Sequence, residues 1–397
     1  MSDAGRLELS RRKFIALSAL GVAGCAARRV GTPKEEDRML YVGTYTDKTA
    51  SEGIYLLRLA PGSGALTIAG VAAETLNPSF VALSPDGASA FAVNEVGELD
   101  GHPGGGVSAF ARDGTAGSGA LRPLGRELTN GADPCYASTD RTGRFLFVAN
   151  YSGGSVAMYP VLAGGGIGAM AGFIQHHGRG PNAERQEGPH AHCVIPDPLN
   201  RFVLVADLGL DRIMAYRFDS QAGKLNTSTA GQGMLAPGAG PRHLAFHPNG
   251  RILYVTNELN STVTAFRYDA ETGSLTELQT VPSVSEPTAV QNFPADIHVH
   301  PSGHFLYMSN RGHNSIAAFT IDAVTSKLAP LQLTSTEGDW PRNFAIDPSG
   351  EFLIVANQRS DSIHSFRIDS STGRLRSTGE RVSLPSPVCV RYFAEKP

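Results

Sequence analysis

Residues 77–87 read NPSFVALSPDG and are followed by FAVN at 91–94 and GVSAF at 106–110. Each piece is short, apolar, and bounded by Gly, Pro, Asn or Asp, which is typical of strands joined by tight turns. The same order recurs from positions Pro134, Pro189, Pro241, Pro294 and Pro341. These six complete copies, at a period of roughly 50 residues with about four strands each, predict a β-propeller.

A seventh copy is divided between the two ends of the chain. Residues 40–44 (LYVGT) and 53–57 (GIYLL) supply its later strands, and residues 387–393 (PVCVRYF) supply its first strand. Pairing these segments would close a ring of blades. We therefore predict one all-β domain, residues 39–397, with seven blades and with the N- and C-terminal strands paired in one blade. The 45 glycines and 25 prolines agree with a structure rich in turns.

The N-terminal segment resembles a targeting sequence rather than part of the fold. Residues 10–15 (SRRKFI) resemble a twin-arginine export signal, and the apolar run that follows is short for a membrane span. Residues 22–25 (VAGC) resemble a lipoprotein box in which Cys25 receives the lipid. We predict that residues 1–38 are a signal and polar tether and that the protein is exported to the periplasm or anchored to the membrane by lipid, the alternative being a loose apolar N-terminus.

Composition excludes several functional classes. The 34 Lys and Arg residues are balanced by 37 Asp and Glu residues and form no basic block, so nucleic-acid binding is not expected. Apart from Cys25, the chain has three cysteines, Cys135, Cys193 and Cys389, without a CxxC pair. Neither a disulfide framework nor a thiolate zinc site is expected from them. We expect a monomer that needs no cofactor.

Comparing the repeats with one another locates a candidate site. The start of each first strand and the end of each second strand lie on the same face of a propeller, because these strands are antiparallel. Residues that follow the repeated prolines are Ser79, Cys135, His190, Arg242, Ala295, Arg342 and Val388. Residues that follow the second strands are Tyr45, Glu95, Tyr151, Leu208, Glu258, Arg311 and Gln358. The residue type at these positions differs from repeat to repeat, whereas the positions around them keep similar residues. This difference indicates a pocket at the mouth of the channel.

The predicted mouth combines histidines with arginines and carboxylates. His190 and His192 would face Arg242, Arg311 and Arg342, with Glu95 and Glu258 nearby. This set suits hydrolysis or formation of a cyclic ester, which needs a base for water, donors for an oxyanion, and cations for an acidic substituent. Glu258 or a histidine would be the base. The alternative is that these charges form structural ion pairs around a wet channel.

Two other features are weighed against simpler explanations. The His-x-His pairs at 190/192 and 298/300 place two imidazoles on one strand face, but the second pair belongs near the opposite end of its strand, so no metal site is expected. His176 and His177 lie in a long insertion that is either a lid over the mouth or a solvated connection.

The chain resembles the seven-bladed propeller lactonase family, which includes the propeller-type 6-phosphogluconolactonases and the carboxy-cis,cis-muconate lactonizing enzymes. The resemblance extends from Met39 to Phe393. It rests on residues 41–46 (YVGTYT), 180–192 (GPNAERQEGPHAH), 240–248 (GPRHLAFHP), 255–260 (VTNELN) and 340–344 (WPRNF). The resemblance implies that the catalytic residues are His190 or His192, Arg242, Glu258 and Arg342. We assign substrate binding to Arg185, Arg311, Tyr45, Tyr151 and Glu95.

The resemblance implies a lactone hydrolase of the 6-phosphogluconolactonase type that opens a sugar lactone to its aldonic acid. The alternatives are a carboxy-cis,cis-muconate-type cycloisomerase and a non-catalytic propeller that binds a partner. Phosphogluconolactone is made in the cytosol, whereas residues 10–25 predict export. We therefore also hypothesise that the substrate is an unphosphorylated sugar lactone or another small lactone.

Overall fold

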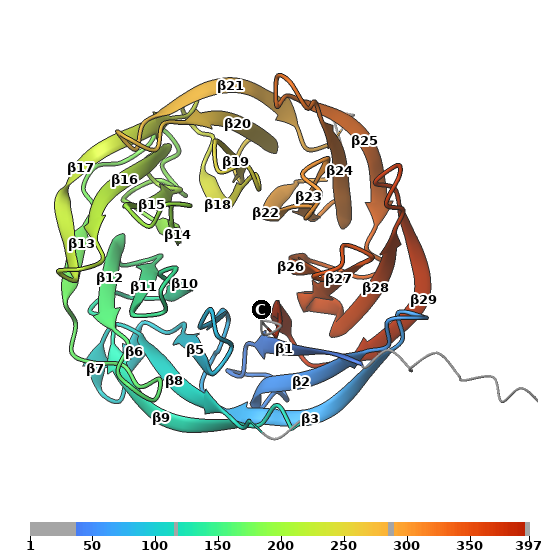
Figure 1. Ribbon diagram of the computed structural model, residues 1–397, viewed down its shortest axis with the longest axis horizontal. Coiled ribbons are helices and arrows are strands. Elements are labelled where there is room, and N and C mark those ends of the chain that lie inside the picture. Colours follow the sequence, from blue (N-terminus) through green and yellow to red (C-terminus); the bar gives the residue numbers. More distant parts are fainter. Residues whose placement is uncertain (1–36, 115–117, 285–289, 394–397) are drawn as a thin grey trace, which may run out of the picture. The chain divides into compact units, whose positions relative to one another are not determined.

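The computed structural model describes residues 37–114, 118–284 and 290–393. Within these ranges the chain forms seven four-stranded antiparallel sheets, one two-stranded sheet and one 3-10 turn, η1 (Gln358–Ser360). The innermost strands contact one another in cyclic order, β4, β10, β14, β18, β22, β26 and β30, and β30 returns to β4. Figure 1 shows the resulting ring of blades. The predicted all-β, seven-bladed propeller is confirmed.

Each blade is given from its innermost to its outermost strand. The first four blades are β30, β1, β2, β3 (Pro387–Tyr392, Arg38–Thr44, Gly53–Leu59, Leu66–Glu74); β4, β5, β8, β9 (Val81–Leu83, Ser89–Asn94, Gly106–Arg112, Leu121–Leu128); β10 to β13 (Pro134–Thr139, Phe145–Asn150, Ser155–Pro160, Gly172–Gln175); and β14 to β17 (Ala191–Pro196, Phe202–Asp207, Arg212–Asp219, Lys224–Met234). The other three are β18 to β21 (Pro241–Phe246, Ile252–Asn257, Thr262–Tyr268, Leu275–Pro282); β22 to β25 (Phe293–Val299, Phe305–Arg311, Ser315–Ile321, Leu328–Ser335); and β26 to β29 (Pro341–Ile346, Phe352–Asn357, Ser362–Ile368, Leu375–Ser383). The hairpin β6 and β7 (Glu98–Leu99, His102–Pro103) is an insertion between β5 and β8.

The two ends of the propeller meet in one sheet. Strand β30 pairs antiparallel with β1, with Leu40 opposite Tyr392 and Val42 opposite Val390. Strand β30 is innermost and β1 to β3 lie outside it, as expected from residues 387–393 and 40–57. The ring is therefore closed by hydrogen bonds between the first and last described strands.

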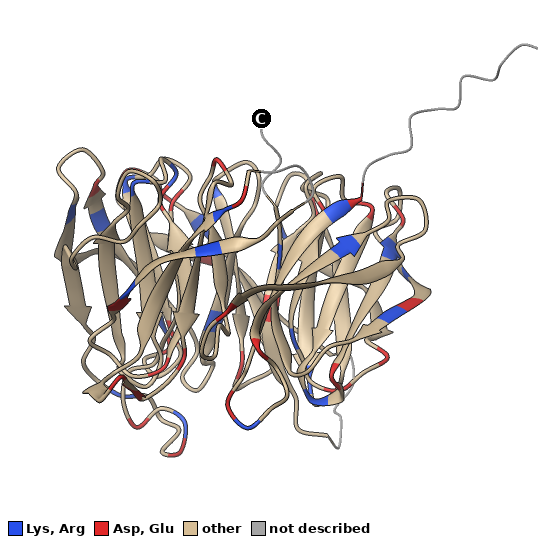
Figure 2. Ribbon diagram, turned by 90° about the horizontal axis from the view of Figure 1, so that it is seen from below, with Lys and Arg blue, Asp and Glu red and all other residues tan. Residues whose placement is uncertain are grey.

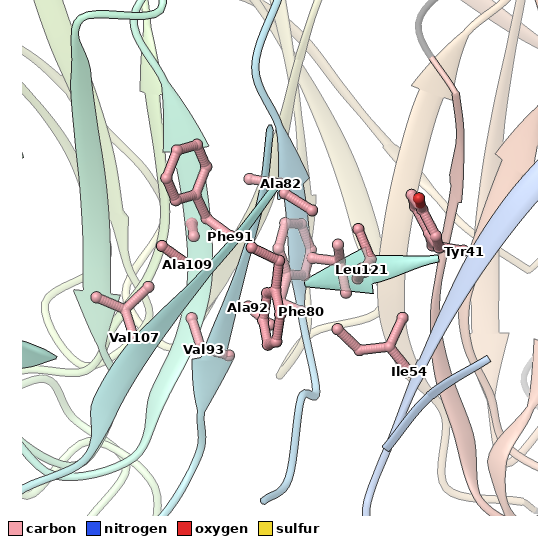
Figure 3. Close-up of a cluster of buried hydrophobic side chains, with 14 of the residues drawn as sticks. Tyr41, Ile54, Phe80, Ala82, Phe91, Ala92, Val93, Val107, Ala109 and Leu121 are labelled. Carbon is pink, nitrogen blue, oxygen red and sulfur yellow. The ribbon is translucent and has the colours of Figure 1, made fainter. Parts of the chain in front are cut away.

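The hydrophobic core lies between neighbouring blades. In Figure 3, Tyr41 and Ile54 of the closing blade pack with Phe80, Phe91 and their neighbours in the next blade. The Tyr41 hydroxyl donates a hydrogen bond to the Gly119 carbonyl over 2.8 Å. All six residues of β5, β11, β15, β19 and β27 are buried. These strands are covered on both faces, which explains why FAVN and its copies are continuous apolar runs rather than alternating ones.

The asparagine at or next to the end of five of the seven second strands is a structural residue. Asn150 is fully buried, and its amide donates to the Ser155 hydroxyl at 3.0 Å and to the Thr129 carbonyl at 3.3 Å. Asn257 donates in the same way to the hydroxyls of Thr262 and Thr264. These bonds tie the end of the second strand to the third, so the repeated asparagine fixes the backbone from which the next, variable residue projects.

The predicted signal and tether fall almost entirely outside the described residues, since the description begins at residue 37. Export, lipidation of Cys25 and the boundary at residue 38 stay predictions. In the part of the chain that is described, no helix has the length and apolar character needed to cross a membrane.

Ring closure gives a stability prediction. Val390 in β30 is fully buried, whereas Val324 is 92% exposed. Val390→Asp places an unpaired carboxylate in the closing sheet and is expected to lower the free energy of unfolding by about 3 kcal/mol or more. The matched substitution Val324→Asp should change it by less than about 0.5 kcal/mol. Urea unfolding followed by circular dichroism measures both, and equal effects would show that closure contributes little.

Candidate active site

The variable positions identified from the repeats gather at one end of the channel. His190 lies immediately before β14, Arg242 is on β18 and Arg342 on β26, all at the starts of innermost strands. Glu95, Tyr151 and Glu258 directly follow the second strands β5, β11 and β19. Pairing of β18 with β19 and of β26 with β27 is interrupted by a bulge at Arg242 and at Arg342. Bulges turn side chains out of the regular alternation, which here allows both arginines to reach the channel.

Glu258 is the centre of the larger charged cluster. Its Oε1 lies 2.6 Å from Arg185 Nη2, and its Oε2 lies 2.6 Å from Arg311 Nη2 and 3.1 Å from Arg242 Nε. The Arg242 contact is an ion pair without hydrogen-bond alignment. The side chains of Glu258, Arg242 and Arg311 are almost fully buried, whereas that of Arg185 is 35% exposed. Three guanidinium groups from separate parts of the chain therefore converge on one carboxylate.

These charges shift one another's pKa values. Burial opposes ionisation of Glu258, but Arg311, Arg242 and Arg185 outweigh it and lower the Glu258 pKa to about 2. Burial lowers the pKa of Arg311 to about 9 against the attraction of Glu258. Burial and the charge of Arg342 also lower the pKa of Arg242. Glu258 is thus an ionised carboxylate that is too weak a base to remove a proton from water efficiently.

Glu95 forms a second, smaller cluster on the other side of the mouth. It accepts a hydrogen bond of 2.8 Å from the Tyr45 hydroxyl and a short one from Ser79. Arg342 Nη2 lies 3.6 Å from Glu95, and its guanidinium lies over the Tyr45 ring at 5.4 Å. Burial raises the pKa of Tyr45, so its hydroxyl is a neutral donor.

The two clusters meet at the floor of the mouth. A cavity of about 10 Å³ is lined by Ser79, Cys135, Arg242, Arg342 and Asn343, among others. This volume is close to that needed for one water molecule. The four arginines of the two clusters face two glutamates, which leaves the mouth with an excess of positive charge.

The two predicted histidines lie beside Tyr151 but differ in their surroundings. The His190 ring stacks on Tyr151 with 4.6 Å between centroids, and its Nδ1 lies 3.1 Å from the Tyr151 carbonyl oxygen. Because a carbonyl only accepts, Nδ1 carries the hydrogen. His190 Nε2 lies 3.2 Å from the exposed Glu187 carboxylate. His192 is deeper, 3.6 Å from the Cys135 sulfur, and burial, followed by the charge of Arg242, lowers its pKa well below the usual value.

The insertion that precedes β14 supplies part of the mouth. His176 is buried between Asp207, 2.6 Å from its Nδ1, and the Tyr216 hydroxyl, 3.1 Å from its Nε2. Gln186 donates to the Leu208 carbonyl and to the Asp211 carboxylate. These bonds anchor the segment from which Arg185 reaches Glu258, so the insertion is more than a solvated connection.

Trp340 belongs to the quoted stretch 340–344, but no role was assigned to it from the sequence. Two arginines contact this residue, with the guanidinium carbon of Arg359 3.4 Å and that of Arg311 5.4 Å from the centroid of its ring. Its φ of 67° is unusual for a large side chain and marks local backbone strain. The position before Pro341 was visible in the sequence, but nothing there indicates a contact with Arg311. As the single tryptophan of the chain, Trp340 is a natural fluorescent reporter of the mouth.

No group of three or more His, Cys, Asp or Glu residues in the described ranges is arranged to hold a metal ion. His298 Nε2 contacts Asp296 at 3.0 Å, and His300 Nε2 contacts the Gly350 carbonyl at 3.0 Å. The described cysteines, Cys135, Cys193 and Cys389, are buried and free. The catalytic and substrate-binding roles assigned to individual residues stay predictions.

Fold and mouth together define a β-propeller whose channel opening holds more arginines than carboxylates. The family model described as "Lactonase, 7-bladed beta-propeller" matches residues 39–392. The Bacillus subtilis protein named 6-phosphogluconolactonase is 38% identical over 353 residues, which cover 89% of this chain and 97% of that protein. The chain belongs to the seven-bladed β-propeller lactonase family.

Solved structures agree with this membership. The structure of the Pseudomonas aeruginosa periplasmic gluconolactonase has a TM-score of 0.83 at 33% identity and covers 91% of this chain and 100% of that one. A Lactobacillus plantarum protein of known structure has the same TM-score at 34% identity, with 90% and 99% of the two chains covered. The similarity therefore extends around the whole propeller.

The Glu258 cluster gives a prediction about acid stability. Ionised Glu258 contributes fully above its ordinary pKa of 4.5, and this contribution is lost as pH falls through about 2. The difference in unfolding free energy between the wild type and Glu258→Gln should therefore be constant from pH 7 to about 5 and shrink below that. Urea unfolding at pH 7, 5, 4 and 3 measures this difference. If this difference in unfolding free energy did not change with pH, the ionised state of Glu258 would not contribute to stability and the prediction would be wrong.

Proposed function

We propose that this protein hydrolyses a sugar lactone that carries an anionic group, of the 6-phosphogluconolactone type, to the corresponding aldonic acid. The observation that carries the proposal is the excess of arginine over carboxylate at the mouth, built from Arg185, Arg242, Arg311 and Arg342. Guanidinium groups bind phosphate and carboxylate in a bidentate manner. The name of the Bacillus subtilis relative supports the same reaction.

We assign different roles to the arginines according to their exposure. Arg185 and Arg342 are the more exposed, at 35% and 17%, and we assign the binding of the anionic substituent to them. Arg242 is buried beside the small cavity, and we assign to it the hydrogen bond to the lactone carbonyl oxygen. Water attacks the carbonyl carbon, the ring C–O bond breaks, and the ring oxygen takes a proton to become a hydroxyl. Arg242 would stabilise the negative charge that develops on the carbonyl oxygen.

We assign the activation of water to His190 rather than to Glu258. A carboxylate with a pKa of about 2 is a weak base, and both oxygens of Glu258 are already in contact with arginines. The Tyr151 carbonyl fixes the His190 hydrogen on Nδ1, which leaves the Nε2 lone pair to accept a proton. Glu187, whose 60% exposed carboxylate lies 3.2 Å from Nε2, would make room for the water and then bind the imidazolium that forms. In this assignment Glu258 holds the arginines in place.

We also propose export, from the twin-arginine and lipoprotein-like features of residues 10–25. The word periplasmic in the name of the Pseudomonas aeruginosa structure supports this proposal. If the protein is exported, the arginines of the mouth would bind the hydroxyl or carboxylate groups of an unphosphorylated lactone in place of a phosphate. Cell fractionation and globomycin-sensitive processing, compared between the wild type and Cys25→Ser, test location and lipidation. A cytosolic wild type would overturn the proposal.

Turnover of a substrate panel tests the reaction. Purified protein is expected to hydrolyse 6-phosphogluconolactone or glucono-lactone faster than buffer, as followed by pH-stat. Arg242→Ala should lower kcat/KM by about 100-fold or more, because an oxyanion donor is lost. Arg376→Ala, which removes an exposed arginine from the outermost strand β29, should leave it unchanged. Conversion of carboxymuconate alone would indicate a cycloisomerase, and no turnover by folded protein would indicate a binding platform.

The role of His190 is tested by separating catalysis from binding. His190→Gln is expected to lower kcat by about 100-fold while the affinity for 6-phosphogluconate, read from Trp340 fluorescence, changes less than threefold. His247→Gln, in the β18–β19 turn at the other end of the strand, serves as the control. Equal losses of kcat and affinity would assign His190 to substrate binding instead.

A further inference from the structure

His243, next to the proposed oxyanion donor, has an unusually complete set of buried contacts. Its Nε2 lies 3.2 Å from Arg242 Nη1, and its Nδ1 lies 2.7 Å from Asp296 Oδ1. The His243 side chain is only 5% exposed. None of the roles assigned above uses this residue.

The partners of His243 determine its protonation. A guanidinium group has donors only, so the hydrogen bond with Arg242 requires a lone pair on His243 Nε2. Nδ1 then carries the hydrogen and donates it to Asp296. Burial, followed by the charge of Arg242, lowers the pKa of His243 to about 3, which is consistent with a neutral ring.

Asp296 holds His243 from the neighbouring blade. Besides His243, it accepts hydrogen bonds from His298 Nε2 at 3.0 Å, from the Asn343 side-chain amide at 2.5 Å and from the Phe344 backbone at 3.2 Å. Asn343 in turn accepts from the Val390 backbone at 2.7 Å. One carboxylate thus links the innermost strands β18, β22 and β26, and Asn343 extends the link to β30. A carboxylate fixed by this many donors has little freedom to turn.

Aromatic packing fixes the plane of the imidazole. The rings of Tyr136 and His192 meet His243 edge-to-face at 5.1 and 5.3 Å, and Phe80 does so at 6.0 Å. The ring cannot rotate without disturbing these neighbours, so the packing keeps its Nε2 directed at Arg242.

The contacts of Arg242 show what this arrangement achieves. Nη1 donates to the Ala295 carbonyl at 2.7 Å and contacts His243, and Nε faces Glu258 at 3.1 Å. These contacts fix two of the three guanidinium nitrogens. Nη2 is the nitrogen left for a substrate oxygen, on an arginine that also lines the small cavity.

We propose that His243 is a positioning residue that, held by Asp296 as the Nδ1–H tautomer, fixes the Arg242 guanidinium so that Nη2 faces the substrate. The proposal deepens the proposed function and rests on it for the identity of the substrate. An imidazole suits this role because it accepts a hydrogen bond from arginine on one side and donates to a carboxylate on the other. A charged or oppositely oriented ring would repel Arg242.

The tautomer is tested without reference to activity. In protein labelled with ¹⁵N-histidine, the His243 signals are identified by comparison with His243→Phe among the 12 histidines. We expect the nitrogen shifts of the Nδ1–H tautomer, unchanged between pH 8 and 5. An Nε2–H tautomer, or titration near the usual histidine pKa of about 6.5, would overturn the proposal even if no lactone were hydrolysed.

A double-mutant cycle tests whether His243 acts through Arg242. His243→Phe keeps the aromatic packing but removes the acceptor, and should weaken 6-phosphogluconate binding, read from Trp340 fluorescence, by roughly tenfold. In an Arg242→Ala background the same substitution should have almost no effect. An equal loss in both backgrounds would show a merely structural role. His300→Phe, which removes another buried, doubly hydrogen-bonded histidine, controls for general destabilisation and should leave binding unchanged.

Discussion

The antiparallel pairing of β30 with β1 is the constraint on which the site depends. In a ring, each innermost strand is positioned by its two neighbours, so the seven strand starts converge only when the circle is closed. The residues of the mouth come from several blades, and no two of the three arginines around Glu258 share one blade. An open ring would separate Arg342 from Glu95, which lie in the blades on either side of the closing one. Closure therefore determines both the stability of the core between blades and the assembly of the charges.

Those charges are costly to bury, which is a reason to regard them as functional. Taking ionised groups out of water costs several kcal/mol for each, and a well-packed apolar cluster would stabilise a channel equally well. Figure 2 shows that much of the strand ribbon is uncharged, with charged residues in the loops and at intervals along the strands. Against this background, a carboxylate enclosed by three arginines is an exception. Its strongly shifted pKa values are characteristic of functional sites.

The mouth shows how a propeller separates scaffold from chemistry. Asn150 and Asn257 recur because they join strands, and the residues after them, Tyr151 and Glu258, vary because they face the channel. The bulges at Arg242 and Arg342 also affect only the site: they turn two side chains toward the channel and leave the outer strands of the blade unchanged. Beneath the arginines, His243 and Asp296 form a second layer that fixes Arg242. Precise placement of a buried arginine requires such a layer.

The sequence by itself determined the propeller, the split closing blade and the ring of variable positions, because repeats and turn residues are local patterns that recur along the chain. It placed Arg242, Glu258 and the other mouth residues near one another for the same reason. It did not determine which arginine pairs with which carboxylate: Arg342 lies against Glu95, and Arg185 reaches Glu258 from an insertion. Nor did it indicate the contacts of His243, Asp296 and Trp340. Those contacts depend on bulges and on packing between blades distant in sequence, and only the tertiary structure decides them.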